Sequence, residues 1–428
     1  MRLVTTIVAA LVIATFTQLP VAASEHQPAT LTADVDFGHT ITFSVEAPLS
    51  GPTPLGIEVH FGLNDSIVVR RALAEHEVTG NILHATHTWE PGTPIVPGAE
   101  IRYQFAIEHT NGEIERTLAS TVTYIDTSLP WKRIREGDVE IWYYAGGASI
   151  ESDARRGIHT ALKTMRETFG AKLERETRLI LYADINRMRA ALGRGTSSWT
   201  AGAAIADFNI TVLHAPARNR DQRDFAATVA HEITHIILAH RTRNSFGRMP
   251  AWLHEGLATT VEMEIDKRFP YAAVMAAAVA HDEFVSLRGI TGSFPASGDR
   301  ALQAYAQSNS LVTYIIDVWG PEGIARLLDK YANGVTDNDA VFAALGMPIE
   351  ELERKWLGTY RVATPVLTSL ARPDATPPRV LSAQVGLPAT PLNSGTAITA
   401  AASIAILFSS LITWRLYRSR LASRDTGE

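Results

Sequence analysis

The feature that most constrains the fold is a helical repeat of apolar residues that carries three polar side chains. Between Phe225 and Ile237 apolar residues recur at the spacing of a helix. His231 and His235, four residues apart, therefore project about 40° from each other on one face. This places two imidazoles within reach of one ion, with Glu232 beside them. The spacing predicts a helix that offers two nitrogen ligands and a nearby carboxylate.

The pattern H-E-x-x-H on a helix is typical of zinc hydrolases. A catalytic zinc needs a third protein ligand and an open fourth position. The chain has no cysteine, which excludes thiolate ligands, disulfides and cysteine nucleophiles. His240 follows His235 by five residues and is rotated about 140° from it on a helix, so it is a poor ligand.

A second short motif, PAWLHEGLA, supplies a better third ligand in Glu255. Pro250 suits the first turn of a helix, and Gly256 lets another segment or a metal approach closely. The loop 241–249 is long enough for the two helices to pack antiparallel. His254 points elsewhere on the helix, which favours a surface position over a role as ligand.

The two motifs together resemble the gluzincins, the thermolysin-like and M1-aminopeptidase-like zinc metallopeptidases. The form W-L-x-E-G-x-A is most similar to the peptidase-MA-like domains of bacterial exported proteins. The resemblance covers about residues 131–360. It implies that His231, His235 and Glu255 bind Zn²⁺ and that Glu232 is the general base. A zinc-activated water would then hydrolyse a peptide bond of a peptide or protein substrate.

The resemblance also nominates two further residues. Glu262, seven residues after Glu255, matches an acid that supports a metal ligand in M1-type relatives, and a solvated helix charge is the alternative. The segment ALQAYAQSNSLVTY resembles the one in which relatives carry a tyrosine that donates to the developing oxyanion, which nominates Tyr305. Tyr314 and Tyr331 are the alternatives, and each of the three could instead be a core residue.

The chain departs from these families at several positions. Leu238 and Arg241 stand where the extended pattern H-E-x-x-H-x-x-G-x-x-H requires glycine and a third histidine. Thr259 replaces the thermolysin-type aspartate. No glutamate follows Gly202 and Ala203, in the place of the GAMEN-like strand of M1 aminopeptidases. This last departure puts aminopeptidase specificity in doubt.

The sequence before and around the motifs predicts two domains that differ in secondary structure. Residues 28–127 alternate polar and apolar residues between Gly- and Pro-rich turns, which predicts an all-β sandwich of immunoglobulin or fibronectin type. Residues 131–362 begin with strand-like runs and continue with helical ones, which predicts an α+β domain of gluzincin type.

Residues 1–24 begin with a basic residue, continue with an apolar stretch and end in small residues, which is typical of a secretory signal peptide. An uncleaved membrane anchor is the alternative. The formal net charge of −6 argues against a nucleic-acid partner. Oligomeric state cannot be inferred from these features.

The C-terminal part predicts a membrane anchor. Residues 363–396 are rich in Pro, Thr and Ala and suit an extended stalk. Residues 397–414 contain no charge, and as a helix they span about 27 Å, close to the thickness of a bilayer core of about 30 Å. Four arginines in residues 415–428 place that tail in the cytoplasm and the rest outside. A packed C-terminal helix is the alternative.

Together these patterns predict a single-pass protein of the cell membrane that is a zinc-dependent metallopeptidase on the outer side. The alternative function is a cell-surface adhesion or sensor protein. In that case the sandwich would bind a partner and the zinc site would be structural or inactive.

Overall fold

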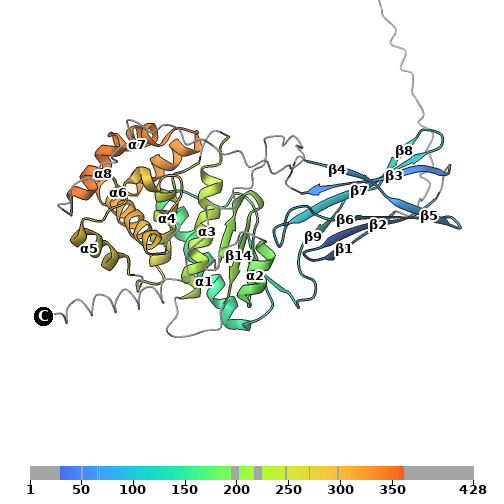
Figure 1. Cartoon of the computed structure of the whole chain (residues 1–428), viewed down its shortest axis with the longest axis horizontal. Helices are drawn as coiled ribbons and strands as arrows, with labels where there is room; N and C mark the ends of the chain where they lie inside the picture. Colours follow the sequence, from blue (N-terminus) through green and yellow to red (C-terminus); the bar gives the residue numbers. More distant parts are fainter. Residues whose placement is uncertain are drawn as a thin grey trace, which may run out of the picture.

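The computed structural model describes residues 29–360 of the 428-residue chain, except 50–51, 65, 67, 194–201, 216–223, 246–247, 269 and 296–297. A β-rich N-terminal part lies at one end, helices lie at the other, and a mixed sheet lies between them (Figure 1). This confirms the predicted succession of a β-rich region and a helical domain.

The predicted signal peptide 1–24, stalk 363–396, membrane helix 397–414 and tail 415–428 lie outside the described residues. Within the described part of the chain, no helix is both long and apolar enough to cross a membrane.

The N-terminal part consists of two antiparallel sheets that share one core. The first has the order β1 (Thr30–Asp36), β2 (Thr40–Pro48), β6 (Ile82–Trp89), β5 (Glu75–Thr79). The second has the order β4 (Arg70–Leu73), β3 (Pro54–Leu63), β7 (Glu100–His109), β8 (Ile114–Arg116), with β9 (Ser120–Thr123) also paired to β7. The ring of Phe43 in β2 lies 5.0 Å from that of Phe61 in β3 and 4.9 Å from that of Tyr103 in β7. Aromatic side chains therefore join the two sheets face to face.

A five-stranded sheet follows, with three parallel central strands and an antiparallel strand at each edge. Its order is β10 (Lys132–Glu136), β11 (Val139–Tyr143), β12 (Thr177–Tyr182), β14 (Ile210–His214), β13 (Gly202–Ile205). Helix α1 (Gly147–Phe169) follows β11, and the short helix α2 (Ile185–Leu192) follows β12.

The two faces of this sheet pack against different layers. Leu179 and Leu181 of β12 belong to the core shared with the helices. Ile180, between them, belongs to the core of the N-terminal sheets. Arg178 strengthens this junction, because it donates to the carbonyl of Gly98 (2.8 Å) and forms an ion pair with Glu100. The sheet thus separates the N-terminal sandwich from the helices on its other face.

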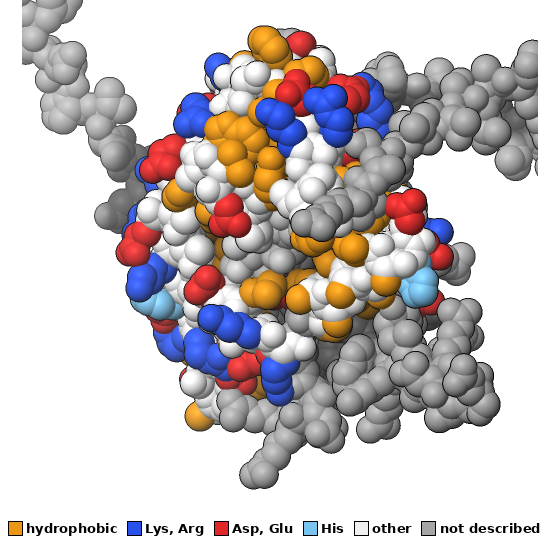
Figure 2. All heavy atoms as spheres, turned by 90° about the vertical axis from the view of Figure 1, so that its left-hand side faces the viewer, with side chains coloured by type: hydrophobic (Ala, Val, Ile, Leu, Met, Phe, Trp, Pro, Cys, Tyr) orange, Lys and Arg blue, Asp and Glu red, His pale blue; other side chains and the backbone are white. Residues whose placement is uncertain are grey.

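The helical layer contains the motif residues. Its elements are α3 (Phe225–Arg241), α4 (Ala251–Met263), α5 (Tyr271–His281), α6 (Gly298–Ala332), α7 (Asp337–Leu345) and α8 (Ile349–Gly358), with short 3₁₀ turns at Ala206–Phe208 and Leu287–Ile290. Non-helical Gly320, followed by Pro321, breaks α6 into two helices. Figure 2 shows this end of the molecule, where acidic and basic side chains are interspersed with apolar ones.

Helix α3 lies at the centre of this layer. Every residue from Phe225 to Leu238 is buried, so this stretch of the helix is surrounded by protein. Helix α1 passes so close that a Cβ on Gly157 would lie 2.4 Å from the carbonyl oxygen of Ala226. This close packing gives α3 a fixed position between the sheet and α4.

Candidate metal centre

The start of α3 is tied to two neighbouring elements. Asp224 caps the helix by accepting from the backbone N–H of Ala226 (3.0 Å). The guanidinium of Arg156 in α1 contacts both carboxylate oxygens of Asp224, at 2.7 and 2.9 Å. The backbone N–H of Asp224 donates to buried Asp266, which follows α4 (3.1 Å). These contacts fix α3 relative to both α1 and α4.

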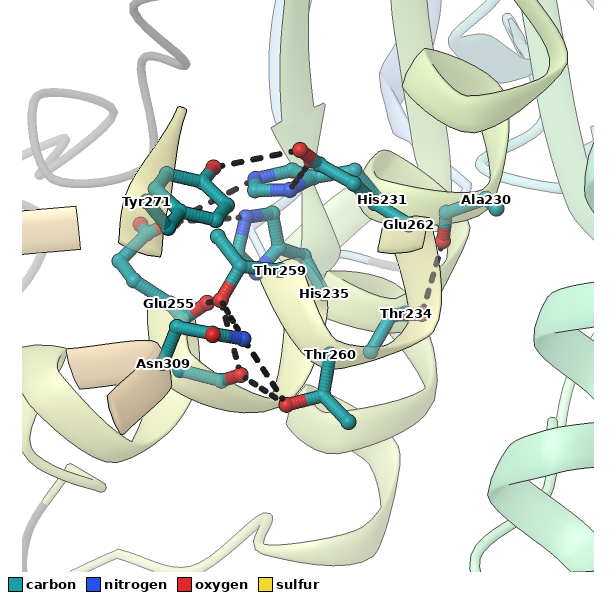
Figure 3. A network of polar contacts seen from close by, with 11 residues as sticks. Ala230, His231, Thr234, His235, Glu255, Thr259, Thr260, Glu262, Tyr271 and Asn309 are labelled. Carbon is teal, nitrogen blue, oxygen red and sulfur yellow. Dashed lines mark hydrogen bonds and ion pairs between the residues drawn. The ribbon is translucent and has the colours of Figure 1, made fainter. Parts of the chain in front are cut away.

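The structure brings together the three residues that were predicted as metal ligands. The Oε2 atom of Glu255 lies 3.4 Å from Nε2 of His231 and 3.4 Å from Nε2 of His235. One ligand atom of each residue lies within 4.8 Å of the other two. All three side chains are buried, and they converge from α3 and α4 in Figure 3.

The donor set fits a divalent cation. Within the described part of the chain, Glu255 Oε2 and His235 Nε2 are buried and have no hydrogen-bond partner. Their separation of 3.4 Å exceeds an ordinary N–H···O hydrogen bond of about 2.7–3.2 Å. Buried polar atoms normally have a partner, and a cation among the three atoms would supply it. Two imidazoles and one carboxylate are a typical protein ligand set for catalytic zinc.

A glutamate contacts the Nδ1 atom of His231, and a tyrosine in turn contacts that glutamate. Glu262 Oε2 lies 2.7 Å from Nδ1 of His231, and the hydroxyl of Tyr271 donates to Glu262 Oε1 at 3.2 Å. Metal-binding histidines commonly use their second nitrogen in this way, which orients the first toward the ion. Glu262 is fully buried, so the alternative of a solvated helix charge is wrong. Tyr271, in the following helix, belongs to no motif and was missed by the sequence analysis.

His235 contacts two other imidazole rings. Its ring centroid is 4.7 Å from that of His231, with the planes at 88°. The ring of His254 stacks on it at 4.3 Å with an angle of 5° between the planes. His254 is not among the three converging ligand residues, as expected, but its side chain is half-buried against His235 and does not lie on the open surface.

The ionisable groups of the centre shift one another's pKa values. Burial alone would raise the pKa of Glu255, but the neighbouring imidazoles outweigh it and hold that pKa well below its ordinary value. Burial alone would lower the pKa of His235, but the charge of Glu255 outweighs it and raises that pKa. Burial, aided by the charge of His235, lowers the pKa of His254 to about 3. Glu255 is thus a carboxylate and His254 a neutral imidazole at neutral pH.

The predicted general base and oxyanion donor also lie at this centre. Glu232 is fully buried in α3, and its charge contributes to the raised pKa of His235. The ring centroid of Tyr305 in α6 lies 6.3 Å from that of His231. Of the alternatives, Tyr314 packs its ring against Trp319, and burial together with the neighbouring Asp337 raises the pKa of the Tyr331 hydroxyl. The structure therefore favours Tyr305 by position, while its role stays a prediction.

Helix α6 supports α4 directly behind Glu255. A Cβ on Gly256 would lie 2.7 Å from the carbonyl oxygen of Ser308, so only glycine allows this approach. Asn309 of α6 also reaches the hydroxyls of Thr259 and Thr260, each at 3.4 Å (Figure 3). The glycine after Glu255 thus serves contact between helices.

His240 takes no part in the centre. Its Nδ1 accepts from the backbone N–H of Glu174 (3.1 Å), and its Nε2 lies 2.6 Å from the side-chain oxygen of Asn209. Both nitrogens therefore have partners outside the group of His231, His235 and Glu255.

Comparison with known proteins finds one family model that covers this centre. Residues 158–361 match the family model of the Peptidase MA superfamily, a range that contains both motifs. No curated protein sequence matches the chain.

Three solved structures are similar at low identity. A mutant of a two-domain M1 zinc metallopeptidase bound to L-arginine shares 16% identity, over 80% of this chain and 95% of that one, with a TM-score of 0.33. An M1 zinc metallopeptidase from Deinococcus radiodurans shares 14%, over 77% and 90%, with a TM-score of 0.32. A mutant M1 zinc metallopeptidase from the same organism, bound to a Tyr-Ser-Ala substrate, shares 14%, over 80% and 95%, with a TM-score of 0.34.

Proposed function

We propose that residues 158–361, which match the Peptidase MA superfamily model, form a gluzincin-type domain and that the protein is a zinc-dependent metallopeptidase. The observation that carries the proposal is the convergence of one atom each from His231, His235 and Glu255 within 4.8 Å of one another. These three residues would hold Zn²⁺, with Glu232 beside them in α3.

The residues around the centre have separate tasks in peptide hydrolysis. Bound zinc would supply Lewis acidity that polarises a peptide carbonyl and makes water more acidic. Glu232 accepts the proton of the attacking water and delivers it to the leaving amine. Tyr305 donates a hydrogen bond to the oxyanion that develops on the carbonyl. Glu262 keeps Nδ1 of His231 engaged, so that Nε2 faces the ligand carboxylate of Glu255.

Peptide hydrolysis is tested with the purified full-length protein and a panel of unstructured polypeptides. We expect cleavage with added zinc, and we expect a strong chelator to abolish it because the ion would leave the three ligands. Fragments identified by mass spectrometry measure both outcomes. Zinc-saturated protein that leaves the whole panel intact would instead favour the adhesion or sensor function.

We further propose that the enzyme is anchored in the cell membrane with its catalytic domain outside. The sequence of residues 1–24 and 397–428 supports this placement, since it combines a signal peptide with an apolar segment followed by arginines. In this arrangement the two N-terminal sheets form an external immunoglobulin- or fibronectin-type sandwich.

Membrane anchoring is tested by fractionating cells that express the full chain or a chain ending at residue 396. The full chain is expected in the membrane fraction and digestible by protease added outside intact cells. The shortened chain is expected in soluble form. A full chain that fractionates with soluble proteins would contradict the anchor.

A further inference from the structure

We propose that His254 is a positioning residue for the metal, because its ring stacks on His235 and sets the plane of that ligand. This inference rests on the proposed zinc site. It concerns how the second histidine of that site is oriented, which neither the H-E-x-x-H spacing nor the family match addresses.

The two histidines of the centre are held in different ways. Nδ1 of His231 has a carboxylate partner, Glu262, at 2.7 Å. Nδ1 of His235 is buried, and among the described residues it has no hydrogen-bond partner. A metal-binding histidine is normally oriented through its second nitrogen. The orientation of His235 must therefore have another source.

The stack with His254 supplies that source. The two planes differ by 5° at a centroid distance of 4.3 Å, so His254 covers one face of the His235 ring. The ring of His231 lies 4.7 Å from that of His235, with the two planes nearly perpendicular. A ring confined in this way cannot swing its Nε2 away from Glu255 without losing the stacked contact.

His254 also couples the two helices of the site. It precedes Glu255 in α4, and its stacking partner His235 lies in α3. Helix α4 would therefore provide one ligand through Glu255 and orient another through His254. The flat ring of His254, and not its nitrogens, is the part that this role requires.

A matched pair of substitutions tests the role of the flat ring. His254→Leu fills much of the space without a planar ring, whereas His254→Phe keeps one. Zinc affinity of the metal-free full-length protein is measured by competition with a chromophoric chelator. We expect His254→Leu to weaken zinc binding by about 10- to 100-fold, as for other residues that orient metal ligands. We expect His254→Phe to bind zinc close to the wild-type affinity.

Two further variants calibrate this measurement. Glu262→Gln weakens the support behind His231 and sets the scale for losing one orienting partner. His281→Ala removes an exposed histidine at the end of α5 and should leave the affinity unchanged. Thermal unfolding of the metal-free variants verifies that each is folded.

Two outcomes would overturn the inference while leaving the zinc site intact. One is a His254→Leu variant with wild-type affinity, and the other is a His254→Phe variant as weak as His254→Leu. Wild-type protein that binds no zinc would overturn the proposed site and this inference with it.

Discussion

A Glu232→Gln variant is expected to lose about 10²- to 10⁴-fold in the rate of peptide hydrolysis while retaining its zinc. Glutamine keeps the shape of the side chain but cannot accept the proton of the attacking water. Glu232 is fully buried in α3 next to His231, so the substitution changes no group on the protein surface. Initial rates on a fluorogenic peptide, measured together with zinc content by elemental analysis, give both quantities.

The matched control is Glu264→Gln, which makes the same chemical change at an exposed position after α4. Its rate should equal that of the wild type. Substantial hydrolysis by Glu232→Gln would rule out Glu232 as the general base. Loss of zinc from Glu232→Gln would mean that the residue acts through metal binding.

A Glu255→Ala variant is expected to lose zinc itself. The carboxylate of Glu255 faces Nε2 of both His231 and His235, each at 3.4 Å. Loss of an orienting partner typically costs about 10- to 100-fold in metal affinity, so the loss of a ligand should exceed about 100-fold. Metal content after exhaustive dialysis, with His281→Ala as the folded control, measures the effect. A Glu255→Ala protein that keeps one zinc per chain would exclude Glu255 as a ligand.

The local pattern of the centre could be predicted from sequence because helical spacing determines it. His231 and His235 had to share a face once their segment was helical, and Pro250 marked the start of the next helix. The distance between Glu255 and the imidazoles could not be predicted. It depends on how α4 packs, and this packing depends on the contact between Gly256 and Ser308 of α6.

The supporting residues could not be predicted because they meet across different elements. Tyr271 reaches Glu262 from α5, and His254 reaches His235 from α4, so no single-helix spacing rule connects either pair. His254 shows this most clearly. Considered alone on its helix it pointed away from the metal ligands, but the packing of α4 on α3 brings the two rings into contact.

The division of the chain was predictable in outline only. Strand β12 (TRLILY) is buried along almost its whole length, which its apolar run indicated. An apolar run does not show which layer covers each face. Here Ile180 meets the N-terminal sheets while Leu179 and Leu181 meet the helices, so two expected domains share one sheet as their boundary.

The most direct test of the metal centre is an anomalous difference map recorded at the zinc absorption edge from crystals of zinc-saturated protein. We expect one peak per chain, about 2.0–2.2 Å from Nε2 of His231, Nε2 of His235 and a carboxylate oxygen of Glu255. A map with no peak among these three residues, or with its only peak elsewhere, such as beside His60 and Glu58, would contradict the account.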